Sequence, residues 1–333
     1  MRILLTGGVG YIGSHTAIVL TKLGHQVFLY DNLSTSGDNV VERLNYLSGQ
    51  EMCFIRGDVL NTELLRRTLE ANSIEAVIHF AGLKAVGESA KQPIDYFTNN
   101  IQGTISLLQA MNSVQIKKLV FSSSAAVYGQ PQYLPLDEYH PTGVTNPYGR
   151  SKLYIEGMLG DIVSSNSDWG IVCLRYFNPV GAHESGVIGE YPRGTPNNLM
   201  PYVAQVAIGY RSQLSIFGKD YSTPDGTGIR DYVHVMDLAE GHSAAIEYLI
   251  NHNGLEVFNL GTGRGYSVLE IVKVFESVSD RLIPYHFEPR RPGDVAQCFA
   301  SIGKAKRELM WSPKRDIVSM CDSAWKFQLS LKD

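Results

Sequence analysis

Two residues that could carry acid–base chemistry lie four positions apart near the middle of the chain. Tyr148 and Lys152 fall in residues 146–152 (NPYGRSK), and three consecutive serines, residues 122–124, precede them. On a helix, residues four apart share a face, so the phenol and the ammonium would point into the same space. A nearby cation favours the phenolate and lowers the pKa of a tyrosine toward a range useful for proton transfer. The same two residues could also lie on a solvated helix face without any catalytic role. The surrounding sequence therefore has to decide between a catalytic and a purely structural interpretation.

A glycine-rich loop near the N-terminus favours the catalytic interpretation. The loop follows an apolar run at 3–5, precedes a stretch of helical periodicity at 14–23, and contains Gly7, Gly10 and Gly13. Strand, glycine turn and helix in this order let the backbone approach a pyrophosphate, which rests on the helix N-terminus. Asp31 ends the next apolar run, where a carboxylate accepts hydrogen bonds from an adenosine ribose and repels a 2′-phosphate. The sequence therefore predicts NAD, in preference to NADP, beside the tyrosine and lysine.

Short apolar runs alternate with amphipathic stretches through the first half of the chain. The runs that we predict to be strands are 3–5, 27–30, 53–55, 76–81, 118–121 and 171–174. Strands separated by helices imply βαβ units, so we predict an α/β fold, a Rossmann-like doubly wound parallel sheet with helices on both faces. In such a sheet the ligand sits beyond the carboxyl ends of the strands, so the segments that follow the strands should line one cleft.

The composition of the sequence changes near residue 178, where prolines and glycines become frequent. We predict helices at 198–210 and 235–250, mixed with short strands. The expected organisation is an NAD-binding Rossmann domain over 1–177 and a smaller mixed α/β substrate-binding lobe over 178–333. Some segments of the second unit are expected to return to the large domain.

Composition excludes several classes of function. A net charge of −4 and an isoelectric point near 6.1 give no support for a nucleic-acid partner. No apolar run is long enough to span a bilayer, so no membrane partner is expected. The four scattered cysteines form no C-x-x-C pair, which indicates neither a metal site nor a disulfide framework. A reducing cytoplasm fits this pattern best.

The chain resembles the extended short-chain dehydrogenase/reductase family and, within it, the UDP-hexose 4-epimerases. The resemblance runs from residue 1 to about residue 315, and the segments that carry it are 6–15, 79–89, 121–129, 147–152, 174–182, 196–201 and 225–235. The glycine loop and the tyrosine–lysine pair are shared by the whole superfamily. Residues 84–89 and the segments after 174 are much more specific to the epimerases.

The resemblance implies a redox-neutral inversion at C4 of UDP-glucose or UDP-galactose, with their N-acetyl counterparts as further candidates. Tyr148 would take the proton of the 4-hydroxyl while C4 gives its hydride to the nicotinamide, and the hydride would return to the opposite face of the 4-keto sugar. Lys152 would hold the nicotinamide ribose and lower the pKa of Tyr148. Ser124 would bridge the sugar oxygen and Tyr148 in a short hydrogen bond.

The resemblance also implies which residues contact the cofactor. The segment 80–84 follows the fourth predicted strand, and its small residues would allow close approach to NAD, with Lys84 neutralising the pyrophosphate. The alternative for Lys84 is a surface lysine, and Asp58 could merely cap a helix. Beside the catalytic three, the predicted NAD contacts are Gly7, Gly10, Tyr11, Ile12, Gly13, Asp31, Asn32, Ser36, Asp58, Val59, Phe80, Ala81, Gly82, Lys84, Asn99, Tyr176 and Phe177.

The substrate handle should be a nucleotide diphosphate, because the sugar must rotate while the rest stays fixed. Arg230 and Arg291 are the predicted pyrophosphate clamps, since guanidinium groups match phosphate oxygens. Cys298 aligns with a position that faces the sugar and often holds tyrosine in epimerases restricted to glucose and galactose, although it could be an ordinary small buried residue. The full predicted substrate set is Asn178, Asn198, Leu199, Ile216, Phe217, Arg230, Tyr232, Arg291, Asp294 and Cys298.

The sequence leaves four alternative functions open. A 4,6-dehydratase would place an Asp-Glu acid pair after the catalytic serine, where this chain has Ala125 and Ala126. A UDP-xylose/UDP-arabinose 4-epimerase or an ordinary alcohol dehydrogenase would share the cofactor half. A non-enzymatic NAD-sensing regulator should have lost Tyr148, Lys152 or Ser124, and all three are present. The family further implies a homodimer formed through a helix bundle.

Overall fold

The fold is described by a computed structural model covering residues 1–37, 39–192, 194, 196–291 and 293–331. Its centre is a parallel sheet of seven strands in the order β10-β6-β5-β4-β1-β2-β3. The strands are β1 (Arg2–Thr6), β2 (Gln26–Asp31), β3 (Cys53–Arg56), β4 (Ala76–His79), β5 (Lys118–Ser124), β6 (Gly170–Tyr176) and β10 (Gly254–Leu260). The predicted Rossmann-like fold class is confirmed, and each of the six predicted strands is present. The seventh, β10, was not predicted.

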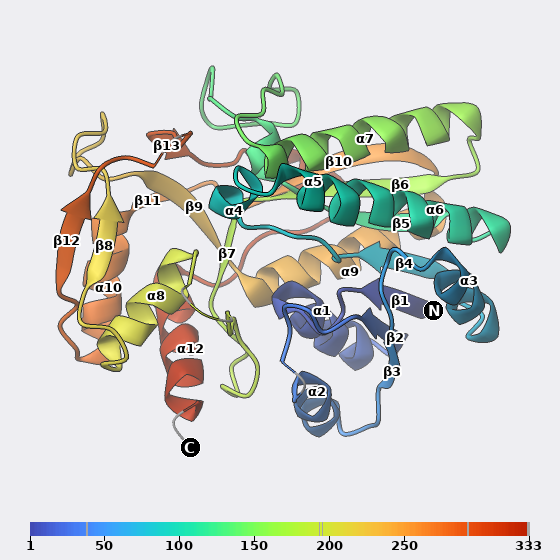
Figure 1. Ribbon diagram of the computed structural model, residues 1–333, viewed down its shortest axis with the longest axis horizontal. Helices are drawn as coiled ribbons and strands as arrows, with labels where there is room; N and C mark the ends of the chain where they lie inside the picture. Colours follow the sequence, from blue (N-terminus) through green and yellow to red (C-terminus); the bar gives the residue numbers. More distant parts are fainter. Residues whose placement is uncertain (38, 193, 195, 292, 332–333) are drawn as a thin grey trace.

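Successive side chains of the central strands point to opposite faces of the sheet, so they contribute to two separate hydrophobic cores. Ile3 and Leu5 face α1 (Tyr11–Lys22) and α9 (Val235–Asn251). Leu4 belongs to the core on the opposite face, with α3 (Thr62–Ala71), α6 (Gly103–Ser113) and α7 (Pro147–Ser165) (Figure 1). All three side chains are fully buried, and burial of each stabilises the fold by about 1.5–3 kcal/mol.

The smaller lobe has its own sheets and its own core. A four-stranded sheet contains β7 (Asn178–Val180), β9 (Ile229–His234), β11 (Gly265–Ser267) and β13 (Gln297–Cys298), and β8 (Leu214–Phe217) pairs with β12 (Tyr285–Glu288). Around them pack α8 (Leu199–Ala207), α10 (Val268–Ser279) and α12 (Ile317–Ser330), with Val203, Phe275 and Met320 in the core. The helices predicted at 198–210 and 235–250 correspond to α8 and α9. Two elements from the second half of the chain return to the large sheet: α9 packs on one of its faces, and β10 forms an edge strand beside β6.

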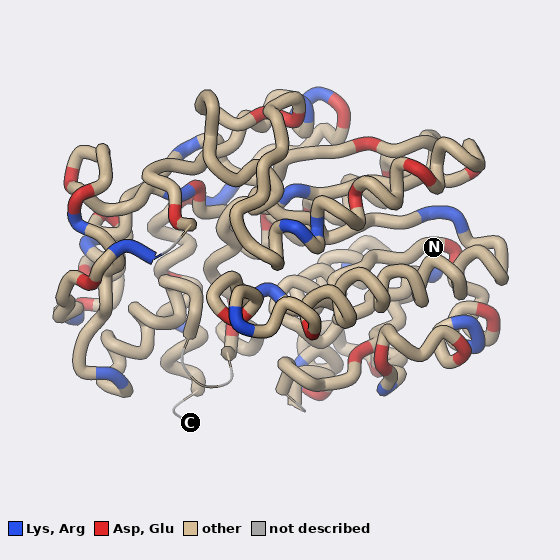
Figure 2. Tube along the Cα trace, turned by 45° about the horizontal axis from the view of Figure 1, so that its top comes forward, with Lys and Arg blue, Asp and Glu red and all other residues tan. Residues whose placement is uncertain are grey.

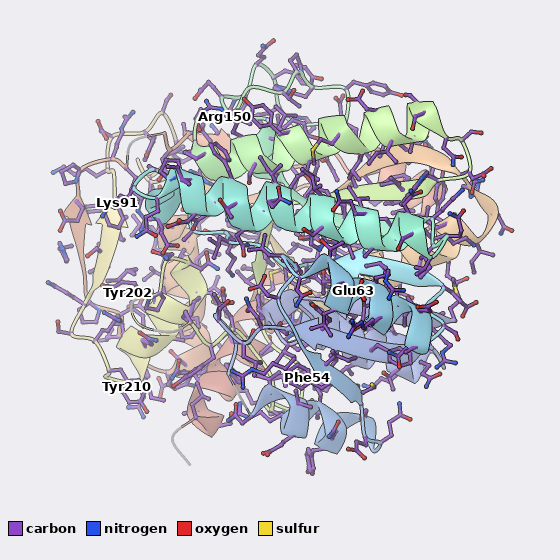
Figure 3. All side chains as sticks on the ribbon, turned by 45° about the vertical axis from the view of Figure 1, so that its right-hand side comes forward. Phe54, Glu63, Lys91, Arg150, Tyr202 and Tyr210 are labelled. Atoms are coloured by element: carbon purple, nitrogen blue, oxygen red, sulfur yellow. The ribbon has the colours of Figure 1, made fainter. Side chains whose placement is uncertain are left out.

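The shorter elements lie mostly in connections. They are α2 (Val40–Ser48), α4 (Val86–Ser89), α5 (Pro93–Tyr96), η1 (Phe97–Gln102), η2 (Ala125–Val127) and α11 (Gly303–Glu308). The π-helical segment η1 continues directly into α6, and α6 and α7 lie side by side across one face of the molecule (Figure 3). Residues 96–116, which include η1 and α6, contain no Lys, Arg, Asp or Glu, and this stretch is tan throughout in Figure 2. None of the described helices combines the length and the apolar character that crossing a lipid bilayer requires.

Candidate active site

One large cavity of about 1050 Å³ extends along the carboxyl ends of the strands and under the smaller lobe. It brings together most of the residues that the sequence singled out. The predicted residues that line it are Gly7, Gly10, Tyr11, Ile12, Gly13, Asp31, Asn32, Ser36, Val59, Phe80, Ala81, Gly82, Lys84, Asn99, Ser124, Tyr148, Lys152, Tyr176, Phe177, Asn178, Asn198, Arg230, Asp294 and Cys298. The predicted residues outside this lining are Asp58, Leu199, Ile216, Phe217, Tyr232 and Arg291.

The glycine loop packs so tightly that side chains would not fit. A Cβ atom on Gly7, which has φ +69°, would lie 2.6 Å from the backbone nitrogen of Ala81, and one on Gly13 would lie 2.4 Å from the Gly7 oxygen. Helix α1 begins after Gly10, and no side chain caps its N-terminus. The first N–H groups of a helix lack intrahelical partners and attract anions. The loop therefore fits the pyrophosphate of a dinucleotide.

Asp31 lies at the end of β2 beside this loop. Its Oδ2 accepts a hydrogen bond from Val9 N at 3.2 Å, and its Oδ1 accepts one from Leu33 N at 2.8 Å. Burial raises the pKa of Asp31, and the two backbone hydrogen bonds act in the opposite direction. Asp58 accepts from the Asn32 side chain at 2.8 Å and from Leu60 N at 2.9 Å, so it organises the neighbouring turn from outside the cavity lining.

The catalytic residues predicted from the sequence are held by the start of α7 and the end of β5. The Asn146 side chain accepts from Gly149 N at 2.8 Å and so caps α7 just ahead of Tyr148. One turn later, Lys152 Nζ donates to the main-chain oxygen of Ser122 at 2.7 Å. This contact ties the helix face that carries Tyr148 to the strand that ends at Ser124.

Electrostatics at Tyr148 differ from the expectation that Lys152 lowers its pKa. Burial raises the pKa of Tyr148, while a hydrogen bond from Ser124 and the positive charge of Lys84 act to lower it. Burial also lowers the pKa of Lys152 to about 8, against the attraction of Glu156. The cation whose charge acts to lower the pKa of Tyr148 is thus Lys84, which comes from the loop after β4.

A buried ion pair beneath the catalytic residues was not predicted from the sequence. Arg175 Nη2 donates to Glu156 Oε2 at 2.7 Å, both side chains are 7% exposed, and Ser123 Oγ donates to Glu156 Oε1 at 2.5 Å. Glu156 lies one turn beyond Lys152 on α7, and Arg175 pairs with Ser123 across β5 and β6. Ser123 therefore has a structural role. The spacing of Tyr148, Lys152 and Glu156, four residues each, was the signal in the sequence for this face of α7.

Asn100, which was also missed, positions the loop that carries Lys84. Its Oδ1 accepts from Leu83 N at 2.8 Å, and its Nδ2 donates to Leu83 O and to Ser151 Oγ, each at 3.0 Å. Asn100 is 1% exposed and lies in η1, and π-helical turns often occur at functional sites. The loop after β4 is thereby joined to α7 next to Lys152.

The other end of the cavity is formed by the smaller lobe. Arg230 Nη2 lies 3.8 Å from Asp294 Oδ1, and Arg230 pairs with Cys298 between β9 and β13. Burial raises the pKa of Cys298 to about 11, so the thiol is neutral near pH 7. The Arg291 guanidinium lies 3.9 Å from the centre of the Phe217 ring. Ile216 and Tyr232 belong to the core of the lobe, and Leu199 begins α8 directly after Asn198.

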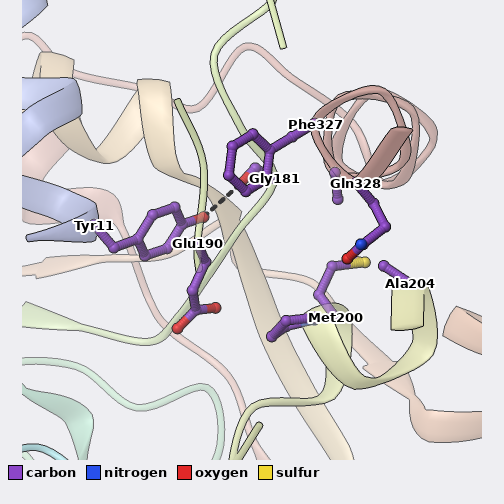
Figure 4. A pocket seen from close by; sticks show the side chains of 9 residues that line it. Tyr11, Gly181, Glu190, Met200, Ala204, Phe327 and Gln328 are labelled. Carbon is purple, nitrogen blue, oxygen red and sulfur yellow. Dashed lines mark hydrogen bonds between the residues drawn. The ribbon is translucent and has the colours of Figure 1, made fainter. Parts of the chain in front are cut away.

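Glu190 is a further cavity residue that the sequence did not indicate. Its Oε1 accepts hydrogen bonds from Lys84 Nζ at 2.9 Å and from Asn198 Nδ2 at 2.6 Å. Glu190 also contributes to a second, much smaller cavity of about 20 Å³, where the Tyr11 hydroxyl donates to Gly181 O at 2.6 Å (Figure 4). That volume suits about one water molecule, so of these two cavities the larger one has room for organic ligands.

Comparisons with known proteins agree with this geometry. A family model described as GDP-mannose 4,6 dehydratase matches residues 4–324. The chain is 54% identical over 330 residues to UDP-glucose 4-epimerase of Bacillus subtilis (strain 168), covering 99% of this chain and 97% of the relative. It is 52% identical over 334 residues to UDP-glucose 4-epimerase of Homo sapiens, with 98% and 96% covered.

Solved structures give the same result. A UDP-glucose 4-epimerase from Stenotrophomonas maltophila with bound NAD and formylated UDP-arabinopyranose has a TM-score of 0.98 at 46% identity, covering 100% of this chain and 99% of that one. One from Bifidobacterium longum in complex with NAD⁺ and UDP has a TM-score of 0.97 at 49% identity, covering 99% and 98%. The chain belongs to the UDP-glucose 4-epimerase family of the extended short-chain dehydrogenases/reductases.

Proposed function

We propose that this protein interconverts UDP-glucose and UDP-galactose by inverting C4 through a 4-keto sugar, with NAD that stays bound during turnover. The observation that carries the proposal is the convergence of Tyr148, Ser124 and Lys152 with a glycine cradle in one cavity. The family membership supports the same reaction.

The residues present fit NAD. We infer that the N-terminus of α1 receives the pyrophosphate, that Asp31 accepts hydrogen bonds from the adenosine ribose, and that Lys84 adds positive charge. When bound, NAD supplies a hydride acceptor that can later return the hydride. Lys152 would hold the nicotinamide ribose from its position on α7.

At the sugar, the protein's own groups move a proton and hold the substrate in place. Tyr148 would take the proton of the 4-hydroxyl and return it to the same oxygen after the sugar has turned, and Ser124 would orient that oxygen. Arg230 and Asn198 would fix the diphosphate from the lobe side. Anchoring at the diphosphate leaves the sugar free to turn between the two hydride transfers.

Dehydration is not favoured by the residues after Ser124. Ala125 and Ala126 line the cavity there, so no carboxyl group stands at that place to remove the 6-hydroxyl. We further propose that residues 1–177 bind mainly NAD and residues 178–333 mainly the UDP-sugar, with α9 and β10 completing the large domain.

The sugar range is proposed to include N-acetyl sugars. Cys298 lines the cavity and is much smaller than tyrosine, which leaves volume for a substituent at C2. A wall residue that overlaps the substituent would exclude it sterically, and this is a stronger filter than loss of one methylene contact.

A homodimer and a cytoplasmic location are also proposed. The uncharged stretch 96–116 places Gln102 and Gln109 on the exposed side of η1 and α6, and Tyr154 of the neighbouring helix α7 is 54% exposed. Depletion of charge is typical of the core of an interface. Gln102→Glu would place one charge from each subunit in this proposed interface and should convert the dimer to a monomer in sedimentation. The free state of all four cysteines fits a reducing compartment.

The test of the proposed reaction uses the protein as purified, without added cofactor. Incubation with UDP-galactose should give an equilibrium mixture with UDP-glucose, with no net oxidation or reduction and no loss of water. A product lighter by one water would indicate a dehydratase. Reduction of added NAD in proportion to the UDP-galactose consumed would indicate a dehydrogenase that exchanges its cofactor.

A further inference from the structure

Glu190 lies where the two halves of the cavity meet. One of its donors, Lys84, comes from the loop after β4, and the other, Asn198, stands directly before α8 in the smaller lobe. Both donate to the same oxygen, Oε1. The Glu190 side chain is 11% exposed, and a carboxylate this deeply buried requires compensating donors. Figure 4 shows Glu190 between Tyr11 of the glycine loop and Met200 of α8.

The contact with Glu190 changes what Asn198 does at its own helix. Asn198 occupies the N-cap of α8 with an extended backbone (φ −89°, ψ 147°), where an asparagine side chain usually accepts from an N–H of the first turn. Here no side-chain cap is formed, because the amide is turned toward Glu190. Pro201, at the third helical position, has no N–H to be capped. The first turn of α8 is therefore left without a side-chain cap of its own.

The contact with Lys84 has a matching effect on the cofactor side. Lys84 is 59% exposed toward the cavity, and its ammonium lies 5.9 Å from the centre of the Tyr11 ring. A lysine with such freedom has many rotamers, and the Glu190 carboxylate restricts it to the space between the glycine loop and the catalytic tyrosine. The pair is also neutral overall, so Glu190 does not make the cavity repel phosphates as a lone carboxylate would.

We propose that Glu190 is a positioning residue that couples the NAD side of the cavity to the UDP-sugar side by holding Lys84 and Asn198 on one carboxylate oxygen. The inference rests on the proposed function, because it assumes that Lys84 faces NAD and that Asn198 faces the diphosphate of the substrate. Binding of UDP-sugar at Asn198 would then stabilise the Glu190–Lys84 contact and strengthen NAD binding, which slows the release of NAD. By linkage, NAD would strengthen substrate binding by the factor by which the substrate strengthens NAD binding.

The experiment uses the NAD-containing protein and UDP as the probe. UDP affinity is measured by calorimetry, and NAD release is timed with and without saturating UDP. In wild type, UDP should slow NAD release. Glu190→Ala should weaken UDP binding about 10-fold or more, as expected for loss of a hydrogen bond to a charged group, and should remove the effect of UDP on NAD release.

Glu190→Gln separates the two contacts. Its amide oxygen can still accept from Asn198, so UDP should bind more tightly than to Glu190→Ala, whereas the lost charge should keep UDP from slowing NAD release. The matched control is Glu184→Gln on the same loop, where the side chain is exposed and outside the cavity lining. This control should behave as wild type in every measurement.

Two results would overturn the inference. One is Glu190→Gln in which UDP slows NAD release by the same factor as in wild type. The other is Glu190→Ala with UDP affinity and NAD release equal to those of the Glu184→Gln control. If Glu190→Ala does not fold, the near-isosteric Glu190→Gln decides alone. Wild type that does not epimerise UDP-galactose would refute the proposed function instead, so the two failures are distinguishable.

Discussion

Lys152 on α7 and Ser122 on β5 are joined by a hydrogen bond of 2.7 Å from the lysine ammonium to the main-chain oxygen. The bond fixes the helix that carries Tyr148 against the strand that ends in Ser124. It also occupies one of the three donors of the ammonium, which leaves the other donors for a ligand in the cavity. Lys152 therefore serves the site through position as well as through charge.

Removing the phenolic oxygen of Tyr148 should abolish most turnover. Tyr148→Phe keeps the ring and its packing, so kcat should fall by roughly 10²–10⁴-fold, the usual range for general acid–base catalysis, while the fold persists. The matched control is Tyr139→Phe, because the Tyr139 side chain is 90% exposed and outside the cavity lining. Steady-state kinetics on UDP-galactose give the comparison, and kcat within a few-fold of wild type would remove Tyr148 from the mechanism.

Asp31 should set the choice of cofactor. Asp31→Ser retains an acceptor for the neighbouring backbone N–H groups but loses the charge that repels a 2′-phosphate, so the preference for NAD over NADP should fall at least about 10-fold. Apoprotein reconstituted with either cofactor gives the two dissociation constants. Asp161→Ser, on an exposed position of α7, is the control. An unchanged NAD/NADP ratio would show that selectivity lies elsewhere.

Cys298 should control access of N-acetyl sugars. Cys298→Tyr fills the cavity wall and should abolish interconversion of UDP-GlcNAc and UDP-GalNAc while leaving UDP-glucose and UDP-galactose turnover within a few-fold. Cys298→Ala, which adds no volume, should retain both activities. Wild type without N-acetyl turnover, or equal damage to both activities in Cys298→Tyr, would contradict the role of Cys298.

Four buried histidines predict a loss of stability in mild acid. Burial lowers the pKa of His15 to about 4 and that of His79, His234 and His242 to about 3. In the unfolded chain these groups take up protons below about pH 6.5, whereas in the folded protein they do so only near their lowered pKa. The free energy of unfolding should therefore decrease as pH falls from about 6.5 toward about 4, by up to about 1.4 kcal/mol per pH unit for each histidine.

Urea unfolding across this pH range measures that slope. His79→Gln can keep contacts to Thr6 and Thr104, which now lie 2.6 Å and 3.0 Å from the His79 ring nitrogens, and should reduce the slope by about one proton. Equal stability at about pH 7 and about pH 5 would contradict the neutral state of these histidines.

The parts of the fold that depend on local pattern could be predicted from the sequence. The first six strands of the large sheet are short apolar runs, whereas β10 was missed because Glu256 and Asn259 interrupt its apolar residues at the edge of the sheet. Tyr148 and Lys152 could be predicted as a pair because residues four apart on a helix lie on the same face.

The rest of the site depends on contacts between distant segments. The partners of Glu156, Asn100 and Lys84 are 19, 17 and 106 residues away in the chain, so no spacing rule reveals them. The raised pKa of Tyr148 likewise follows from burial, which the sequence does not display. Ile216 and Tyr232 were predicted to contact the substrate but lie in the core of the smaller lobe, and their burial is likewise not visible in the sequence.

The central claim is that the hydride removed from C4 returns to C4 within one bound cofactor. UDP-galactose carrying deuterium at C4 tests it when incubated with the purified protein in ordinary water, with no NAD added. We predict UDP-glucose that retains the deuterium at C4, measured by mass spectrometry and NMR. Loss of the deuterium to solvent, or no formation of UDP-glucose, would contradict the mechanism.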